Sequence, residues 1–212
     1  MLFRSYLHFT DTRYDIIATD CTDLRYKSNA NLYDLGYFRL CGERINPGGM
    51  VVVWMPLGGL SDAAFRCALR TFRAVFPHVT IWYLNNEPTH YILLLGTKEP
   101  QRYNYDRIVE RLKEESVRAD LAELYLDNAD KLLSCFVLDE TGLDPILGDG
   151  PLNTEDTPFL EFESPKYGLG AVPLKKNLGR LYDAMTPVTR CVTGASAEAR
   201  EYPSAREPGK GM

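Results

Sequence analysis

Two carboxylates three residues apart, Asp20 and Asp23, are the strongest candidates for chemistry in this sequence. They follow the run 14–19, which contains β-branched residues and lacks Gly and Pro. Such a run favours a strand that is covered on both faces, as in a parallel sheet. In open α/β sheets, ligands bind outside the carboxyl ends of the strands. We therefore expect both carboxylates to lie where a ligand binds.

Carboxylates at the end of a strand can serve two chemical purposes. They can hold a cationic ligand, and they can accept a proton from a group that must become a nucleophile. The other interpretation of Asp20 and Asp23 is a polar turn, in which Asp side chains bond their own backbone. From the residue types alone, the turn is the more common outcome.

Alternating strands and helices are predicted along the first half of the chain. The apolar periodicity predicts strands at 14–19, 50–55, 79–84 and 91–97, and helices at 31–41 and 62–76. Asn31 is the predicted N-cap of the first helix, and Ser61 or Asp62 is that of the second. The link 85–89 is too short for a helical crossover, so the last two strands must pair antiparallel.

The fold class predicted from this order is α/β. A sheet with parallel strands and an antiparallel edge hairpin is typical of the second half of a Rossmann-like, S-adenosylmethionine methyltransferase-type fold. We expect a C-terminal helical extension beyond it. The predicted domains are 1–100 for the partial Rossmann-like domain, 101–192 for the helical and loop extension, and 193–212 for a disordered tail.

The extension is rich in helix and turn signals. Two helices are predicted at 106–116 and 119–138, and a shorter one at 174–185. Residues 139–166 contain repeated Gly and Pro and are predicted to form loops. Within them, the segment 159–163 alternates apolar and charged residues and would add a strand.

The composition excludes several classes of function. The 212 residues carry a net charge of −5, and 45% of them are hydrophobic. The chain lacks the excess of basic residues that a nucleic-acid-binding protein needs. It also lacks an apolar run of the roughly 18 to 20 residues that span a membrane, and it lacks the apolar core of a signal peptide. We therefore expect a cytoplasmic protein without nucleic-acid or membrane partners.

The five cysteines and three histidines form no recognisable ligand set. No two cysteines have the CxxC spacing, and their number is odd. A disulfide framework is therefore not expected, and no metal site is predicted. Cys41, Cys67 and Cys135 lie within apolar helical patterns and are predicted to be buried thiols.

Four short motifs in the first part of the chain resemble one enzyme family. They are Tyr14-Asp15-Ile16-Ile17, Asp20-Cys21-Thr22-Asp23, Leu32-Tyr33 and Asn46-Pro47-Gly48-Gly49. In this order they resemble the C-terminal half of the catalytic domain in the spermidine/spermine synthase (polyamine aminopropyltransferase) family. The likeness covers roughly residues 5–98, under half the chain, and 151–158 resembles a motif near the end of synthase-like proteins.

The resemblance implies a transferase of the aminopropyltransferase type, which moves an aminopropyl group from decarboxylated S-adenosylmethionine to an amine acceptor in polyamine biosynthesis. It implies that Asp20 accepts the proton of the attacking amine and that Asp23 helps to hold the polyamine. Tyr33 is a further candidate for the substrate site, although an aromatic residue at helical spacing is more often part of the core. A protonated amine, with a pKa near about 10.4, is not a nucleophile, which is an independent reason for a proton acceptor. The implied partner is a small-molecule amine or polyamine. Decarboxylated S-adenosylmethionine would be the co-substrate, and no tightly bound cofactor is expected.

The chain departs from the family pattern on both sides of this motif. The family's glycine-rich loop and acidic ribose ligand would precede the first strand, and here only Arg4 matches the expected Asp-Gly-Arg. After the carboxylates, residues 24–30 replace the family's Pro and Gly-Pro-Ala, and they bring Arg25 and Lys27 toward a cation site. We therefore expect a truncated form that lacks the nucleotide-binding half, and the identity of the acceptor amine stays open.

A sheet that begins at 14–19 would have an unpaired edge. We expect that edge to be covered by a second copy of the chain in a homodimer or by another chain. The residues are also compatible with two functions other than aminopropyl transfer. One is a non-catalytic remnant or partner-dependent module, and the other is a methyltransferase-like enzyme that acts on another acceptor.

Overall fold

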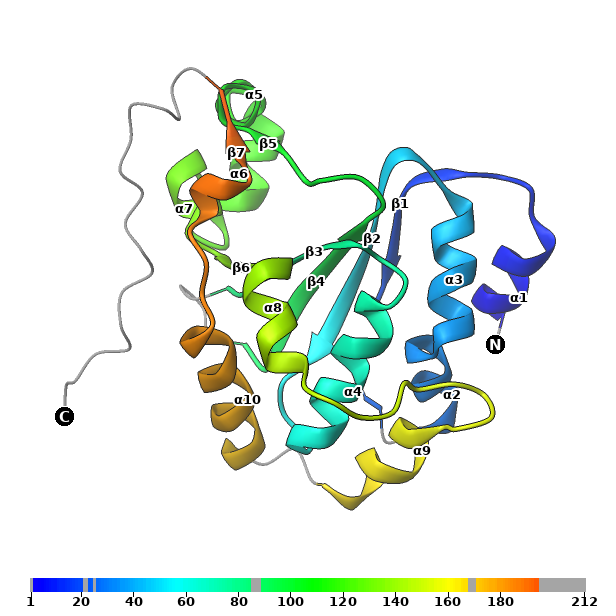
Figure 1. The fold of residues 1–212 in the computed structure, drawn as a ribbon. Coiled ribbons are helices and arrows are strands. Elements are labelled where there is room, and N and C mark those ends of the chain that lie inside the picture. The colour runs from blue at the N-terminus through cyan, green and yellow to red at the C-terminus, as the bar shows by residue number, and fades with distance from the viewer. Residues whose placement is uncertain (1, 21–22, 25, 85–88, 168–170, 195–212) are drawn as a thin grey trace.

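The computed structural model describes residues 2–20, 23–24, 26–84, 89–167 and 171–194 (Figure 1). A five-stranded sheet lies at its centre, in the order β1-β2-β4-β3-β6. The strands are β1 (Tyr14–Thr19), β2 (Ile45–Pro56), β3 (His78–Trp82), β4 (Tyr91–Thr97) and β6 (Phe136–Asp139). The predicted bounds of β1 and β4 are confirmed, whereas β2 begins earlier than predicted.

The directions of the strands agree with the predicted fold class. β1 and β2 run parallel and are joined through a helix. β3 and β4 form the predicted antiparallel hairpin, and β4 also pairs antiparallel with β2. The hairpin is therefore folded into the sheet, with β4 between β2 and β3. This mixed α/β architecture is consistent with a partial Rossmann-like, methyltransferase-type sheet.

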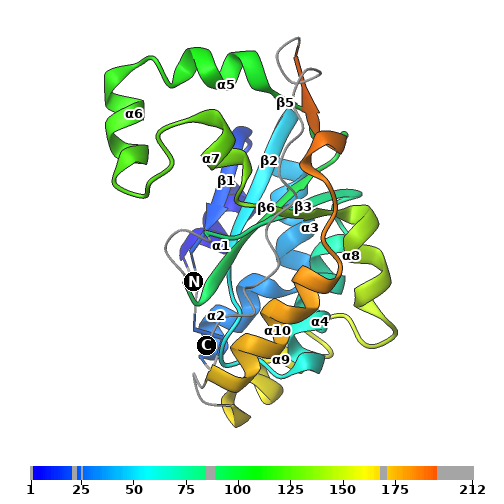
Figure 2. The same cartoon turned by 90° about the vertical axis from the view of Figure 1, so that its left-hand side faces the viewer.

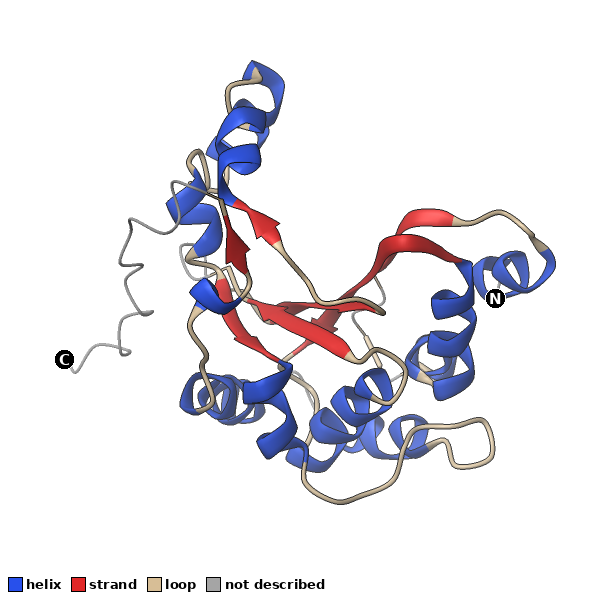
Figure 3. Ribbon diagram, turned by 45° about the horizontal axis from the view of Figure 1, so that its top comes forward, coloured by secondary structure: helices blue, strands red, loops and turns tan. Residues whose placement is uncertain are grey.

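Five of the described α-helices cover one face of the sheet (Figures 1 and 3). They are α3 (Leu35–Arg44), α4 (Asp62–Arg73), α8 (Glu140–Leu147), α9 (Phe159–Glu163) and α10 (Ala171–Asp183). At the centre of this core, Phe38 and Phe72 meet edge to face with 5.0 Å between ring centroids, and Phe72 lies 4.6 Å from Phe76. Buried aromatic rings of this kind supply a large share of the stabilisation of a core.

The segment before α3 consists of three short elements. They are α1 (Leu2–Phe9), α2 (Lys27–Ala30) and the 3-10 turn η1 (Asn31–Tyr33). α1 lies beside α3, and the Arg44 guanidinium of α3 donates a hydrogen bond to the Leu7 carbonyl of α1 at 3.0 Å. The first helix is thereby held against the helical layer.

The opposite face of the sheet is bare over β1. Side chains alternate between the two faces along a strand. Ile17 is buried against the helices, whereas Ile16 is 60% exposed. The prediction that this strand is covered on both faces is therefore wrong. The reason is that, among the described elements, helices pack on one side of β1 only.

A small helical arm stands over the same bare side, near the far end of the sheet from β1 (Figure 2). It consists of α5 (Tyr105–Arg111), α6 (Glu115–Ala122) and α7 (Ala129–Leu133). Its own small core contains Tyr105, Leu112, Ala129 and Leu133. The remaining elements are β5 (Tyr103–Asn104), η2 (Ser164–Lys166), η3 (Val188–Arg190) and β7 (Val192–Thr193). β5 and β7 pair at the base of the arm.

The helix predicted at 119–138 is not continuous and ends too late. α6 ends at Ala122, α7 covers Ala129–Leu133, and Phe136–Asp139 forms β6, which pairs antiparallel with β3. A short apolar run has the same composition in a buried helix and in a buried strand, so periodicity does not separate the two. The predicted loop 139–166 contains the helix α8, and 159–163 is the helix α9 rather than a strand.

The caps of the two central helices correct one prediction and confirm another. The Asp34 carboxylate accepts a hydrogen bond from the Tyr37 backbone N–H at 2.7 Å and caps α3, so the predicted cap at Asn31 is wrong. Burial raises the pKa of the Asp34 carboxyl above its ordinary value. The Ser61 hydroxyl caps α4 by accepting from the Ala64 N–H at 3.1 Å, as predicted.

The predicted burial of three cysteines is confirmed. Cys41, Cys67 and Cys135 are free and buried. Burial raises the pKa of the Cys41 thiol to about 12, which keeps it protonated and unreactive at neutral pH. Within the described ranges, no helix is both long and apolar enough to cross a membrane. Most of the predicted disordered tail, residues 195–212, lies outside the described part of the chain.

The segment Asn46-Pro47-Gly48-Gly49 is an irregular stretch inside β2. The register moves from Tyr14 opposite Ile45 to Ile16 opposite Met50, so β2 has extra residues here. A side chain at Gly49 would place its Cβ 3.0 Å from the backbone oxygen of Asp15. Glycine is therefore required for the close approach of the two strands.

Replacing Gly49 with alanine should lower the free energy of unfolding by about 1–3 kcal/mol, because the new methyl group overpacks the β1–β2 contact. Urea denaturation measures the change. Gly179 is the matched control, since it lies inside α10 with no atom within 4 Å of the point that a Cβ would occupy. Gly179→Ala should stabilise the protein by about 0.5–1 kcal/mol. Equal effects of the two substitutions would contradict the tight approach at Gly49.

Candidate active site

The carboxyl end of β1 is anchored by Thr19. Its hydroxyl lies 2.7 Å from the Tyr37 hydroxyl of α3, and both groups are buried. Asp20 follows directly and is exposed. The structure therefore places Asp20 at the carboxyl end of a strand next to solvent, where the sequence predicted a ligand. The buried hydrogen bond of Thr19 therefore fixes the point at which the backbone of Asp20 leaves the sheet.

Asp23 lies in the loop that follows and is partly buried. Its backbone carbonyl accepts a hydrogen bond from the Asn29 side-chain amide at 2.9 Å. Cys21, Thr22 and Arg25 lie outside the described residues, as does the side chain of Lys27. The pairing of Asp23 with Asp20 around one ligand stays a prediction.

Tyr33 is placed in the core rather than on a cavity wall. It is 1% exposed, and its hydroxyl donates a hydrogen bond to the backbone carbonyl of Trp54 at 2.9 Å. The residue therefore supports the carboxyl end of β2, next to the end of β1. Its predicted role as a direct substrate contact stays a prediction.

Replacing Tyr33 with phenylalanine should lower the free energy of unfolding by about 1 kcal/mol, because a buried carbonyl loses its donor. Thermal denaturation measures the change. Tyr6→Phe is a suitable control, since the Tyr6 hydroxyl bonds only at the exposed surface, to Tyr14. A Tyr33→Phe variant with normal stability but without ligand binding would instead show that the hydroxyl touches the ligand.

Trp54 lies near the carboxyl end of β2. The last printed pair of β1 and β2 is Thr19 with Val53, and Trp54 follows Val53 in the chain as Asp20 follows Thr19. Val53 is buried, and Trp54 on the other face is 39% exposed. Trp54 was not among the site residues that the sequence predicted. The signal that was missed is the one-residue alternation within an apolar strand.

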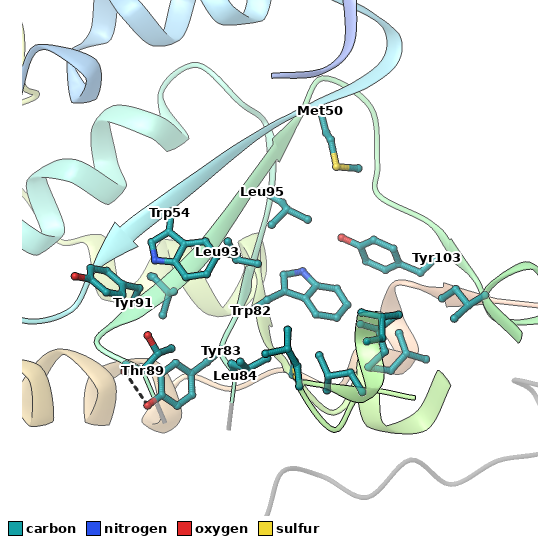
Figure 4. Close-up of a pocket in the computed structure, with 18 of the residues that line it drawn as sticks. Met50, Trp54, Trp82, Tyr83, Leu84, Thr89, Tyr91, Leu93, Leu95 and Tyr103 are labelled. Atoms are coloured by element: carbon teal, nitrogen blue, oxygen red, sulfur yellow. Dashed lines mark hydrogen bonds between the residues drawn. The ribbon is translucent and has the colours of Figure 1, made fainter. Parts of the chain in front are cut away.

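The indole of Trp54 borders a cavity of about 950 Å³ over the bare face of the sheet (Figure 4). Trp54 and Tyr91 lie near one end, with 6.1 Å between their ring centroids. Trp82 and Tyr103 lie near the other end and meet edge to face at 5.2 Å. Side chains of the arm close the cavity on the far side from the sheet: Ile108, Leu121, Leu124, Leu126, Leu132 and Leu133. The sequence analysis did not predict this cavity, since its walls come from distant segments.

The side chain of Asn153 forms a clamp, because its hydrogen bonds hold the backbone of the segment before α3 in place. The Asn153 side-chain amide donates hydrogen bonds to the carbonyls of Ala30 at 3.3 Å and Tyr33 at 3.2 Å. Its side-chain oxygen accepts from the Leu160 backbone N–H at 3.0 Å. The side chain is 2% exposed, so this is a buried, satisfied polar cluster. The sequence analysis recognised the motif 151–158 but not this clamp.

Arg4 links the same motif to the first helix. Its guanidinium contacts the Asp34 carboxylate at 2.7 Å and also pairs with Glu155. Arg4 thus connects α1, the cap of α3 and the segment that carries Asn153. The residue that matched the family pattern at the front of the chain has a structural role here.

Within the described ranges, no three His, Cys, Asp or Glu side chains gather as a metal site would require. The exposed side chains near the carboxyl ends of β1 and β2 are the carboxylate of Asp20 and the indole of Trp54. Such a set suits an organic cation, since carboxylates attract the charge and aromatic faces attract cations or apolar groups.

Comparison with known proteins gives a distant likeness to a characterised enzyme. No protein-family model matches the chain. The chain is 28% identical over 185 residues to Polyamine aminopropyltransferase 2 of Pseudomonas aeruginosa. The match covers 80% of this chain and 50% of that protein, so the chain spans about half the length of its curated relative. This distant likeness agrees with the family resemblance that the motifs indicated.

Proposed function

We propose that this chain takes part in spermidine-synthase-like aminopropyl transfer, from decarboxylated S-adenosylmethionine to an amine acceptor. The observation that carries the proposal is the exposed carboxylate of Asp20, which follows the carboxyl end of β1. The likeness to a polyamine aminopropyltransferase supports it. Polyamine biosynthesis is the process to which such a reaction belongs.

In the proposed reaction, Asp20 takes a proton from the ammonium group of the acceptor. The freed nitrogen lone pair then forms a bond to the carbon next to the sulfonium of the co-substrate. The bond from that carbon to sulfur breaks, and its electron pair stays on sulfur as a neutral thioether. General base assistance of this kind contributes roughly 10²- to 10⁴-fold to a rate.

Asp23 and Tyr33 take supporting roles in this proposal. Asp23 supplies a second negative charge for a cationic acceptor, from the loop that Asn29 holds. Tyr33 fixes the end of β2 through the Trp54 carbonyl. We assign no described residue to the nucleotide part of the co-substrate.

A second candidate function is a partner-dependent module. Two observations favour it: β1 has no strand partner on its outer side among the described residues, and the chain spans about half of its relative. A free parallel edge next to Asp20 suits another polypeptide, either a second copy or a different chain, that completes the sheet. The amine site would then act only in the assembly.

Mass spectrometry of a reaction mixture tests the proposal. The chain is incubated with decarboxylated S-adenosylmethionine and a set of primary amines. We expect a product one aminopropyl group heavier than its amine, together with methylthioadenosine. Absence of both products from a folded protein would contradict catalysis by this chain. Light scattering on the same sample then distinguishes an assembly from a lone chain.

A further inference from the structure

A second, smaller cavity adjoins the apolar one at the arm. It has a volume of about 330 Å³ and is lined by β5 and by the three helices of the arm. Four residues line both cavities: Tyr103, Ile108, Leu121 and Leu132. Tyr103 lies at the end of the larger cavity that is nearer to the arm (Figure 4). Both cavities are partly open to solvent, so one ligand can extend from one to the other over the shared side chains.

The two cavities differ in charge. Arg102, Arg107 and Arg111 line the smaller one, and its described lining contains no aspartate or glutamate. The larger cavity is apolar, and no lysine, arginine, aspartate or glutamate is among its described lining residues. Its volume of about 950 Å³ lies within the range of about 300–1,000 Å³ that is typical of small-molecule sites. Positive charge is therefore confined to one end of the combined surface.

The three arginines have hydrogen-bond donors to spare. Arg107 and Arg111 are four residues apart on α5, so their side chains lie on the same side of that helix. Arg111 pairs with Glu114 at 2.7 Å, but both side chains are exposed, and exposed pairs of this kind are weak. The Arg107 guanidinium has no ion-pair partner among the described residues. Arg102 donates one hydrogen bond, to the Arg190 carbonyl at 3.0 Å.

The two cavities together restrict the chemistry of a ligand. Guanidinium groups bind carboxylates through paired, charge-assisted hydrogen bonds. A second ionised group on the ligand would lie in the apolar cavity without a counter-charge, which is unfavourable. A neutral apolar molecule would gain nothing from the arginines. A molecule with one carboxylate and a long apolar body satisfies both cavities.

We propose that the two cavities bind a carboxylic acid with a long apolar body, of the fatty-acid type. The body lies over Trp82 in the larger cavity, and the carboxylate meets Arg107 and Arg111 in the smaller one. This site lies at the arm, and it does not depend on the proposed aminopropyl transfer or on Asp20.

The test uses the chain's own fluorescence. Trp54 and Trp82 are the only two tryptophans in the sequence, and both line the larger cavity. Dansylaminoundecanoic acid is titrated into the protein below its micelle concentration and followed by energy transfer from tryptophan. Its methyl ester lacks the charge and is the matched probe. We expect the acid to bind roughly tenfold more tightly than the ester, and dodecanoate to displace it better than dodecylamine does.

A pair of substitutions in α5 locates the carboxylate. Arg107→Gln combined with Arg111→Gln should reduce the preference for the acid over the ester to less than about threefold. Lys113→Gln combined with Arg118→Gln is the matched control. It removes the same charge from exposed residues of the arm that line neither cavity. The control should keep the preference of the parent chain.

A substitution in the larger cavity locates the apolar body. Leu124 belongs to its lining and is 38% exposed, so Leu124→Gln should leave the fold intact and weaken the acid and the ester by the same factor. Phe162→Gln, at an apolar but 67% exposed position on α9, is the control and should bind both probes like the parent chain. Circular dichroism shows whether each variant is folded.

Four outcomes would overturn the assignment. Equal binding of the acid and the ester would show that the arginines do not recognise the ligand. An equal loss of preference in the control pair would reduce the effect to the net charge of the arm. Absence of binding, or binding that Leu124→Gln does not change, would reject the larger cavity as the seat of the body. Binding to phosphatidylglycerol vesicles without binding of the soluble acid would assign this face to a membrane surface.

Discussion

Replacing Asp20 with asparagine should lower the rate of aminopropyl transfer by a factor of about 10² to 10⁴. Asparagine has almost the same shape, but its amide does not take a proton from an ammonium group at neutral pH. Asp20 is exposed, so the free energy of unfolding should change by less than about 0.5 kcal/mol. Product formation measured by mass spectrometry, together with urea denaturation of the same samples, checks both statements.

Asp11→Asn is the matched control for this substitution. Asp11 is an exposed aspartate close to β1 but at its opposite end. The control should transfer the aminopropyl group at the parent rate. If Asp20→Asn were as active as the control, Asp20 would be part of an ordinary polar turn, which is the other interpretation of the motif.

Replacing Asn153 with alanine should lower the free energy of unfolding by about 2–4 kcal/mol. The change leaves two carbonyls, of Ala30 and Tyr33, and the Leu160 N–H without their buried partner. Each unsatisfied buried group costs about 1–3 kcal/mol, and partial relaxation reduces the sum. Because the clamped loop leads to Tyr33 and the end of β2, ligand binding should weaken as well. Urea denaturation followed by circular dichroism measures the stability.

Asp156→Ala tests whether the effect belongs to the clamp. Asp156 lies in the same motif but is exposed, and its removal should change the free energy of unfolding by less than about 0.5 kcal/mol. A small effect of Asn153→Ala, comparable to that of Asp156→Ala, would contradict the role assigned to the clamp.

The strands that build the site were predictable from local patterns. β1 and β4 have the predicted bounds because each is a compact apolar run between polar segments. The extension was less predictable. Phe136–Asp139 forms β6 because it pairs with β3, and that partner is far away in the sequence. Local periodicity carries no information about such pairing, so the helix predicted there was wrong.

In the candidate site, too, the features that depend on local sequence were predictable and those that depend on distant segments were not. Asp20 was predictable because the end of a strand and the start of a polar loop are visible in sequence. The apolar cavity was not, since Trp54 and Trp82 belong to different strands and the arm closes over both. The clamp by Asn153 depends on contacts that span 120 residues or more to Ala30 and Tyr33. Long-range contacts of this kind become visible only in the folded chain.

Hydrogen–deuterium exchange in the presence of an amine tests the central claim most directly. The protein is examined with dansylcadaverine and, separately, with spermidine. At least one amine should slow exchange in peptides that contain Thr19, Asp20 and Trp54, and Asp20→Asn should remove this protection. Exchange at the carboxyl ends of β1 and β2 that neither amine changes would contradict an amine site there, as would protection that persists in Asp20→Asn.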